Sequence, residues 1–108
     1  MTRLTPKSRA ERELDEIELI FKALAHHARR HILVVLKARG GQMTAGDIAK
    51  RFSCAWPTTT RHLRQLEDAG LVSTTKDGRE SIYKLETKKL NSVLGDWLNW
   101  FNDTQKGE

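Results

Sequence analysis

The chain has 108 residues, 38% of them hydrophobic, and a net charge of +5 at pH 7. This length favours a single globular domain, and the composition excludes fibrous and disordered classes. The longest apolar run, residues 32–36, is far too short to cross a bilayer, and no secretory signal pattern is present, so we expect a cytoplasmic protein.

Positive charge is concentrated in the middle of the chain. Residues 13–25 carry a net charge of −3, whereas residues 26–49 and 50–84 each carry +3. A polyanionic partner would therefore meet the middle of the chain. Residues 1–10 are expected to form a basic, flexible tail, and residues 11–108 a single domain.

Two helices are predicted in the first forty residues. Ser8 and Glu11 have the spacing of a capping box, so the first helix should begin near Arg9. A second helix is predicted over residues 27–38. Its apolar run, residues 32–36, would also suit a buried strand, but the alanine, lysine and arginine around the run favour a helix.

A helix-turn-helix is predicted over residues 44–70. A short helix runs through Phe52, and residues 55–70 form a longer amphipathic helix, with Pro57 suited to its first turn and Gly70 to the position after its last. Its two faces differ, because Thr59, Leu63 and Leu66 share one side, and the opposite side carries Pro57, Thr58, Arg61, Arg64 and Gln65.

A β-hairpin wing is predicted over residues 71–85, because the dipeptide Asp77-Gly78 suits a tight turn between two short strands. Thr87 is the expected cap of a last helix over residues 87–104, whose wide apolar face suggests packing against a second copy of the chain. The expected dimer contacts lie on the first and last helices: Leu14, Leu19, Leu90, Val93, Leu94, Trp97, Leu98, Trp100 and Phe101.

The predicted fold is mainly α with a β-hairpin wing and has about five helices. Four stretches stand in a characteristic order and spacing: FKALAHHARRHIL, MTAGDIAKRF, WPTTTRHLRQLEDAGLV and DGRESIYKL. Through them the chain resembles the ArsR-type (arsenical-resistance repressor) winged helix-turn-helix regulators over residues 21–101. The chain resembles most the non-metal, autorepressor-like branch of the family, because it lacks the metal ligands and contains MTAGDIA and LGDWLNWF. His26-His27 stands where the family often has Asp-Pro, and Ala55 where it often has Ser, so weaker helix caps are expected at both places.

The resemblance implies a homodimeric transcriptional repressor that binds double-stranded operator DNA with inverted repeats. A helix fits the major groove and reads bases mainly from its N-terminal half. Arg61 is the expected guanine contact, and Arg79 at the wing tip is expected to enter the minor groove. The complete set of expected DNA contacts is Trp56, Thr58, Thr60, Arg61, His62, Arg64, Gln65, Lys76, Arg79 and Lys84.

Other functions are weighed against this one. A winged-helix module that binds a protein through residues 58–65 or 97–101 is the main alternative. The two sites commonly used by the family's metal sensors lack ligands, so no metal or other cofactor is expected, although His27 and His31 have two-ligand spacing.

Further functional questions concern side chains outside the proposed reading face. His26, just before the second helix, and His27 and His31 within it are expected to have structural or capping roles, and Cys54 to be a small turn residue rather than a redox sensor. A metal- or redox-responsive member of the same family is a further alternative, and the sequence leaves open whether an effector exists. No side-chain arrangement predicts catalysis.

Overall fold

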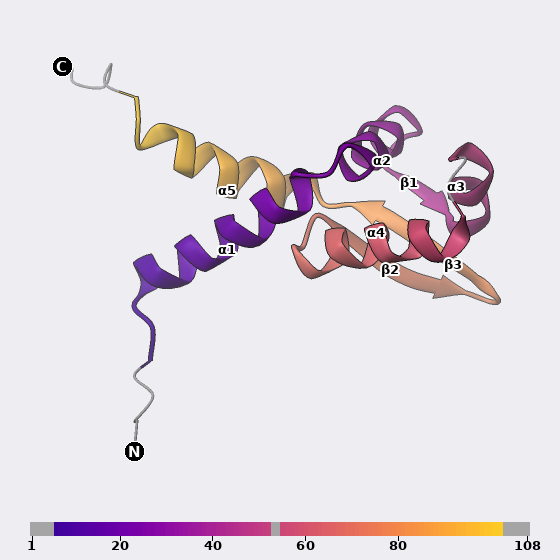
Figure 1. Ribbon diagram of the computed structural model, residues 1–108, viewed down its shortest axis with the longest axis horizontal. Helices are drawn as coiled ribbons and strands as arrows, with labels where there is room; N and C mark the ends of the chain where they lie inside the picture. Colours follow the sequence, from indigo (N-terminus) through magenta and orange to yellow (C-terminus); the bar gives the residue numbers. More distant parts are fainter. Residues whose placement is uncertain (1–5, 53–54, 103–108) are drawn as a thin grey trace.

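The computed structural model describes residues 6–52 and 55–102, and this part contains five helices and three strands. In chain order they are α1 (Arg9–Leu24), α2 (His27–Ala38), β1 (Gln42–Thr44), α3 (Ala45–Arg51), α4 (Trp56–Asp68), β2 (Val72–Asp77), β3 (Glu80–Leu85) and α5 (Thr87–Asn99). The molecule is flat, with principal extents of 49, 48 and 25 Å. Helices α1 and α5 extend together on one side, and the β2–β3 hairpin points to the other (Figure 1). No helix of the described ranges is long and apolar enough to span a membrane.

The predicted capping box at the start of α1 is confirmed. The backbone N–H of Glu11 donates to Ser8 Oγ at 3.2 Å, and the backbone N–H of Ser8 donates to Glu11 Oε1 at 2.9 Å. Because Arg9 and Ala10 are already helical, the expected tail over residues 1–10 is too long by at least two residues. Residues 1–5 lie outside the described part of the chain.

One expectation about helix caps is confirmed and one is wrong. The capping role expected of His26 is confirmed, because its Nδ1 accepts a hydrogen bond from the backbone N–H of Ala28 at 3.2 Å at the start of α2. Helix α5 is preceded by Glu86 as N-cap, and Thr87 is its first residue. The carboxylate of Glu86 instead accepts a 2.6 Å hydrogen bond from the hydroxyl of Ser73. Ala55, as expected, gives α4 no side-chain cap.

The sheet has three strands, one more than the sequence predicted. Its order is β1-β3-β2, and both pairings are antiparallel. The extra strand, β1, follows Gly40 and Gly41, whose positive φ angles of 89° and 99° turn the chain from α2 back toward β3. The hairpin turn at Gly78, with φ of 65°, is confirmed.

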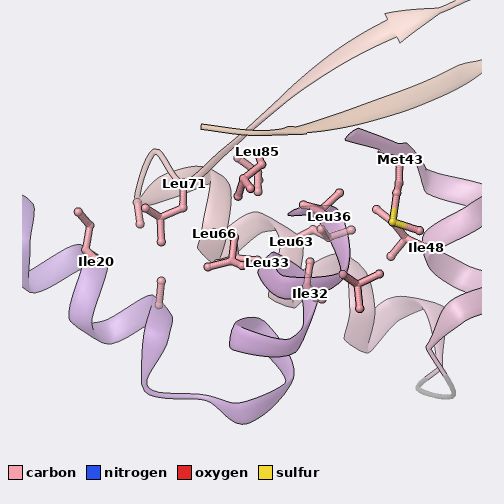
Figure 2. Packing of buried hydrophobic residues seen from close by; sticks show 14 residues of the cluster. Ile20, Ile32, Leu33, Leu36, Met43, Ile48, Leu63, Leu66, Leu71 and Leu85 are labelled. Carbon is pink, nitrogen blue, oxygen red and sulfur yellow. The ribbon is translucent and has the colours of Figure 1, made fainter. Parts of the chain in front are cut away.

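A single hydrophobic cluster fixes α4 against the rest of the domain. Figure 2 shows Ile20 of α1, Leu36 of α2 and Leu63 and Leu66 of α4 in this cluster, and all four are at most 1% exposed. The predicted inner stripe of α4 is confirmed by burial, since Thr59 is also only 2% exposed. Helix α5 contributes only partly buried side chains to the cluster, namely Leu90, Val93 and Leu94.

Candidate nucleic-acid interface

The outward face of α4 carries the basic side chains that the sequence placed there. Arg61 and Arg64 are exposed, and Trp56 at the first position of the helix is 41% exposed. Thr58 and Gln65 are half-buried on the same side. The N-terminal half of α4 therefore presents long polar and aromatic groups to solvent.

The structure corrects the expected placement of His62 and of the Thr60 hydroxyl. His62 is only 7% exposed, and Thr60 is half-buried with its Oγ1 shielded from solvent and without a hydrogen-bond partner among the described residues. The pattern Thr59, His62, Leu63 and Leu66 has the i, i+3, i+4, i+7 spacing of a buried helical stripe. This spacing was the signal in the sequence that His62 faces inward.

The wing presents three basic residues on different surfaces. Arg79 lies in the exposed turn between β2 and β3. In the β2–β3 register Lys76 is opposite Ser81, and Lys84 is opposite Ser73. Directly opposite residues share a face of the sheet, whereas residues three apart on one strand, such as Ser73 and Lys76, lie on opposite faces. The two lysines therefore lie on opposite faces of the sheet. Lys76 and Lys84 therefore cannot contact the same stretch of backbone beside Arg79.

The basic side chains of α4 and the wing take part in none of the ion pairs found in the described part of the chain. Three ion pairs are present there: Lys7 with Asp15, Arg9 with Glu13 at 3.1 Å, and Lys89 with Glu16 at 2.8 Å. All three involve α1 or the residues just before it. The positive charge of α4 and the wing is thus left for an external anion.

A polar cluster joins α4 to the ends of α1 and α2. The Arg29 guanidinium donates through Nε to the backbone carbonyl of Ala23 at 2.7 Å, and its Nη1 lies 3.2 Å from Nδ1 of His62. The imidazole rings of His26 and His62 pack with their centroids 4.4 Å apart. Burial lowers the pKa of His62 below its ordinary value of 6.5, and the charges of His26, Arg29 and Arg61 lower it further.

Within residues 6–52 and 55–102, no third ligand completes the histidine pair considered for metal binding. The rings of His27 and His31 are 6.0 Å apart, and His31 packs edge-on against Phe52 at 4.9 Å. Among the described residues no group of three or more histidines, cysteines or carboxylates could hold a metal ion. Cys54 lies outside the described residues.

The expected dimer residues fall into two sets. Leu90, Val93 and Leu94 pack partly against the chain's own core, and Trp97 packs edge-on against Phe21 at 4.9 Å. The others are exposed, with exposed fractions of 57% for Leu14, 48% for Leu19, 60% for Leu98, 83% for Trp100 and 67% for Phe101. We define the arm as α1, α5 and the two residues after α5, Trp100 and Phe101, and it keeps a large apolar surface in contact with solvent.

A hollow of about 340 Å³ lies between the two helices of the arm. Its apolar walls include Leu14, Ile17, Val93, Trp97 and Trp100. A large side chain from another surface would fit a hollow of this kind.

Comparisons with known proteins give consistent matches over most of the chain. A family model described as a helix-turn-helix domain matches residues 24–75. The transcriptional repressor SdpR of Bacillus subtilis is 41% identical over 90 residues, which cover 82% of this chain and 93% of that protein. An arsenical resistance operon repressor of Staphylococcus aureus is 32% identical over 91 residues, covering 84% and 85% of the two chains. A crystal structure of an ArsR family transcriptional regulator superposes with a TM-score of 0.74 at 30% identity, covering 87% of this chain and 94% of that one.

Proposed function

This chain belongs to the ArsR family of winged helix-turn-helix transcriptional regulators, and from that premise we propose that it represses transcription by binding double-stranded operator DNA. The observation that carries the proposal is the exposed, basic N-terminal half of α4, which lies outside the ion pairs of the described residues. The relatives reported above are named repressors rather than enzymes, and repression follows when a bound protein occupies a promoter.

In the proposed complex α4 lies in the major groove. Arg61 donates two hydrogen bonds to a guanine, and the Trp56 ring contacts a thymine methyl group or the sugar backbone. Thr58, Arg64 and Gln65 supply further base or phosphate contacts from the same face. His62 is buried and makes no base contact in this proposed complex. Thr60 contacts DNA in it by turning its buried hydroxyl outward.

The wing adds contacts beside the major groove. Arg79 extends from the turn into or near the minor groove, where narrow A·T-rich stretches attract guanidinium groups. Lys76 and Lys84 bind phosphates from opposite faces of the sheet. These contacts position the protein along the duplex, whereas the contacts from α4 select its sequence.

The proposed functional unit is a homodimer joined through the arm. The arm has exposed apolar side chains, namely Leu14, Leu98, Trp100 and Phe101. In a two-fold symmetric dimer this surface would be buried against the same surface of the second copy. Such a dimer holds two α4 helices about one helical turn of DNA apart, ~34 Å, or a multiple of it, so its operator is an inverted repeat. We further propose that the protein acts in the cytoplasm, where promoter DNA is accessible.

A binding-site selection tests this proposal directly. The purified full chain is mixed with a library of random double-stranded DNA at near-physiological salt, and the bound duplexes are sequenced over several rounds. We expect an inverted repeat with half-sites one turn apart to be enriched, and a dimer in sedimentation velocity at micromolar concentration. Failure to enrich any sequence contradicts sequence-specific binding and favours a protein-interaction module. A monomer at that concentration contradicts the dimer.

A further inference from the structure

Arg29 connects three helices through one guanidinium group. Its Nε donates to the carbonyl of Ala23 at 2.7 Å, and its Nη2 donates to the carbonyl of Lys22 at 3.3 Å, so it satisfies acceptors at the C-terminal end of α1. Its third contact, Nη1 to Nδ1 of His62 at 3.2 Å, reaches α4. Arg29 itself belongs to α2 and is half-buried.

The chemistry of the pair determines the protonation state of His62. A guanidinium has five N–H donors, no acceptor, and keeps its charge at all ordinary pH values. Nδ1 of His62 must therefore accept the hydrogen bond, so the ring is neutral and carries its proton on Nε2. A second proton on Nδ1 would remove the acceptor and set two positive groups against each other.

The surroundings of His62 favour the same neutral form. The charged and titratable groups that act on it are His26, the N-cap of α2, Arg29 of α2 and Arg61 of α4, and all of them are basic. The helix α1 presents backbone carbonyls to Arg29 in this region, and those carbonyls are occupied by the guanidinium. The His26 ring lies against the His62 ring, with centroids 4.4 Å apart, and its Nδ1 accepts a hydrogen bond from the backbone N–H of Ala28.

We propose that Arg29 is a positioning residue for DNA recognition, which through neutral His62 holds the reading helix α4 against the end of the arm helix α1. This inference rests on the proposed function, since it concerns how α4 is set for operator DNA. Because α1 also belongs to the dimer surface, the contact fixes the direction of α4 relative to the partner copy. When His62 takes up a proton the contact is lost, and the two reading helices of a dimer lose their mutual alignment.

The test measures specificity as a function of pH. The probes are the duplex enriched by selection and a shuffled duplex of the same composition. The readout is the ratio of their Kd values at constant ionic strength, as the pH is lowered from 7.5 to the most acidic value at which circular dichroism still shows a folded chain. Added positive charge on any histidine strengthens binding to both duplexes, so this nonspecific effect cancels in the ratio. We expect the ratio of the wild-type protein to fall several-fold on acidification.

His62→Asn is the matched variant for this test. The asparagine side-chain oxygen is separated from Cα by the same number of bonds as Nδ1 of histidine, and it accepts a hydrogen bond at every pH used. We expect His62→Asn to keep most of the specificity at pH 7.5 and to show no decrease on acidification. Arg29→Met keeps the aliphatic part of the side chain but removes the donors, so we expect low specificity throughout the pH range. Circular dichroism verifies that each variant is folded.

A spectroscopic measurement checks the same contact without DNA. Long-range ¹H–¹⁵N correlation spectra distinguish the two neutral tautomers of histidine, and we expect the Nε2–H form for His62. A Nδ1–H tautomer, or superimposable pH profiles for the wild type and His62→Asn, would overturn the inference while leaving the proposed function intact. If no duplex is enriched by selection, the proposed function fails and the inference fails with it.

Discussion

Two regions of the molecule expose different kinds of surface. One is the reading end, formed by α4 and the wing, and the other is the arm. On the reading end the exposed groups are charged, with Arg61, Arg64 and Arg79 outside the ion pairs of the described residues. The arm contains two ion pairs, Arg9 with Glu13 and Lys89 with Glu16, and its large exposed hydrophobic groups include Trp100, which is 83% exposed. The first surface suits a polyanion, and the second suits an apolar partner.

This difference shows how one small domain separates two binding tasks. The buried side of α4 packs in the hydrophobic core, so residues on its exposed side can differ to suit DNA without changing the packing of the core. Helix α5 contains no buried residue, so its stability depends on α1 and on whatever covers its apolar face. Within the described part of the chain, the arm is therefore the region whose apolar side chains are least covered in a single copy.

The strongest test of the comparison is to remove the largest exposed aromatic ring of the arm. We expect Trp100→Ser to weaken dimerisation by at least ~30-fold, because buried tryptophans in interfaces typically contribute about 2 kcal/mol or more. Val34 on α2 provides the matched control, since it is 66% exposed but lies outside the arm, and Val34→Ser should leave the dimer unchanged. Sedimentation equilibrium measures both variants. Equal weakening by both would contradict the placement of the interface.

The second test concerns sequence discrimination by the reading end. Replacing Arg61 with alanine should cost about 1–3 kcal/mol on the selected duplex, the usual value of a bidentate guanine contact. The loss should be confined to one base position of each half-site, which competition with single-base variants of the duplex would locate. An equal loss on every duplex would instead identify Arg61 as a phosphate contact.

A smaller and different effect is expected at the wing tip. Arg79→Ala should weaken binding to selected and shuffled duplexes alike, because a residue that replaces counterions contributes to affinity without reading bases. The slope of log Kd against log salt should fall by about one contact, ~0.9. Fluorescence anisotropy titrations at several salt concentrations measure this slope, and an unchanged slope would exclude Arg79 from the interface.

The smallest expected effect is on stability. Since the pKa of His62 is lower in the folded than in the unfolded chain, the unfolded chain binds a proton first as the pH falls below about 6.5. The free energy of unfolding should therefore decrease from pH 6.5 down to the folded-state pKa and lose nothing more from this group below it. Urea unfolding of wild type and His62→Asn would show this, and a parallel decrease in both would assign it to other groups.

Much of this fold is predictable from local signals in the sequence. Ser8 with Glu11, Gly70, and Asp77 with Gly78 mark ends and turns through residue types that few other conformations favour. Strand β1 was missed because three residues are too few to show alternation, and it exists through its pairing with β3. Non-local pairing of this kind leaves no periodic trace in the sequence.

The candidate site was predictable only in part, for related reasons. The outward position of Arg61 follows from helical spacing, but Lys76 and Lys84 could be assigned to opposite faces only once the register of the hairpin was known. The role of Arg29 depends on where α1 ends relative to α4, which is a tertiary property. The capping role of His26 was expected from its place at the start of a predicted helix, where Nδ1 of an imidazole can accept a backbone N–H.

The short strand β1 also has a consequence for the timescale on which the wing opens. It pairs with Ile82, Tyr83 and Lys84 of β3, so these residues lie in the centre of three strands, whereas Glu80 and Ser81 are held only by β2. Amide hydrogen exchange should therefore divide β3 into a slow inner segment and a fast outer one that carries Arg79 on its turn. In the proposed complex, the Arg79 guanidinium at the tip could then move within the minor groove, while the hydrogen bonds at the base of the wing remain formed.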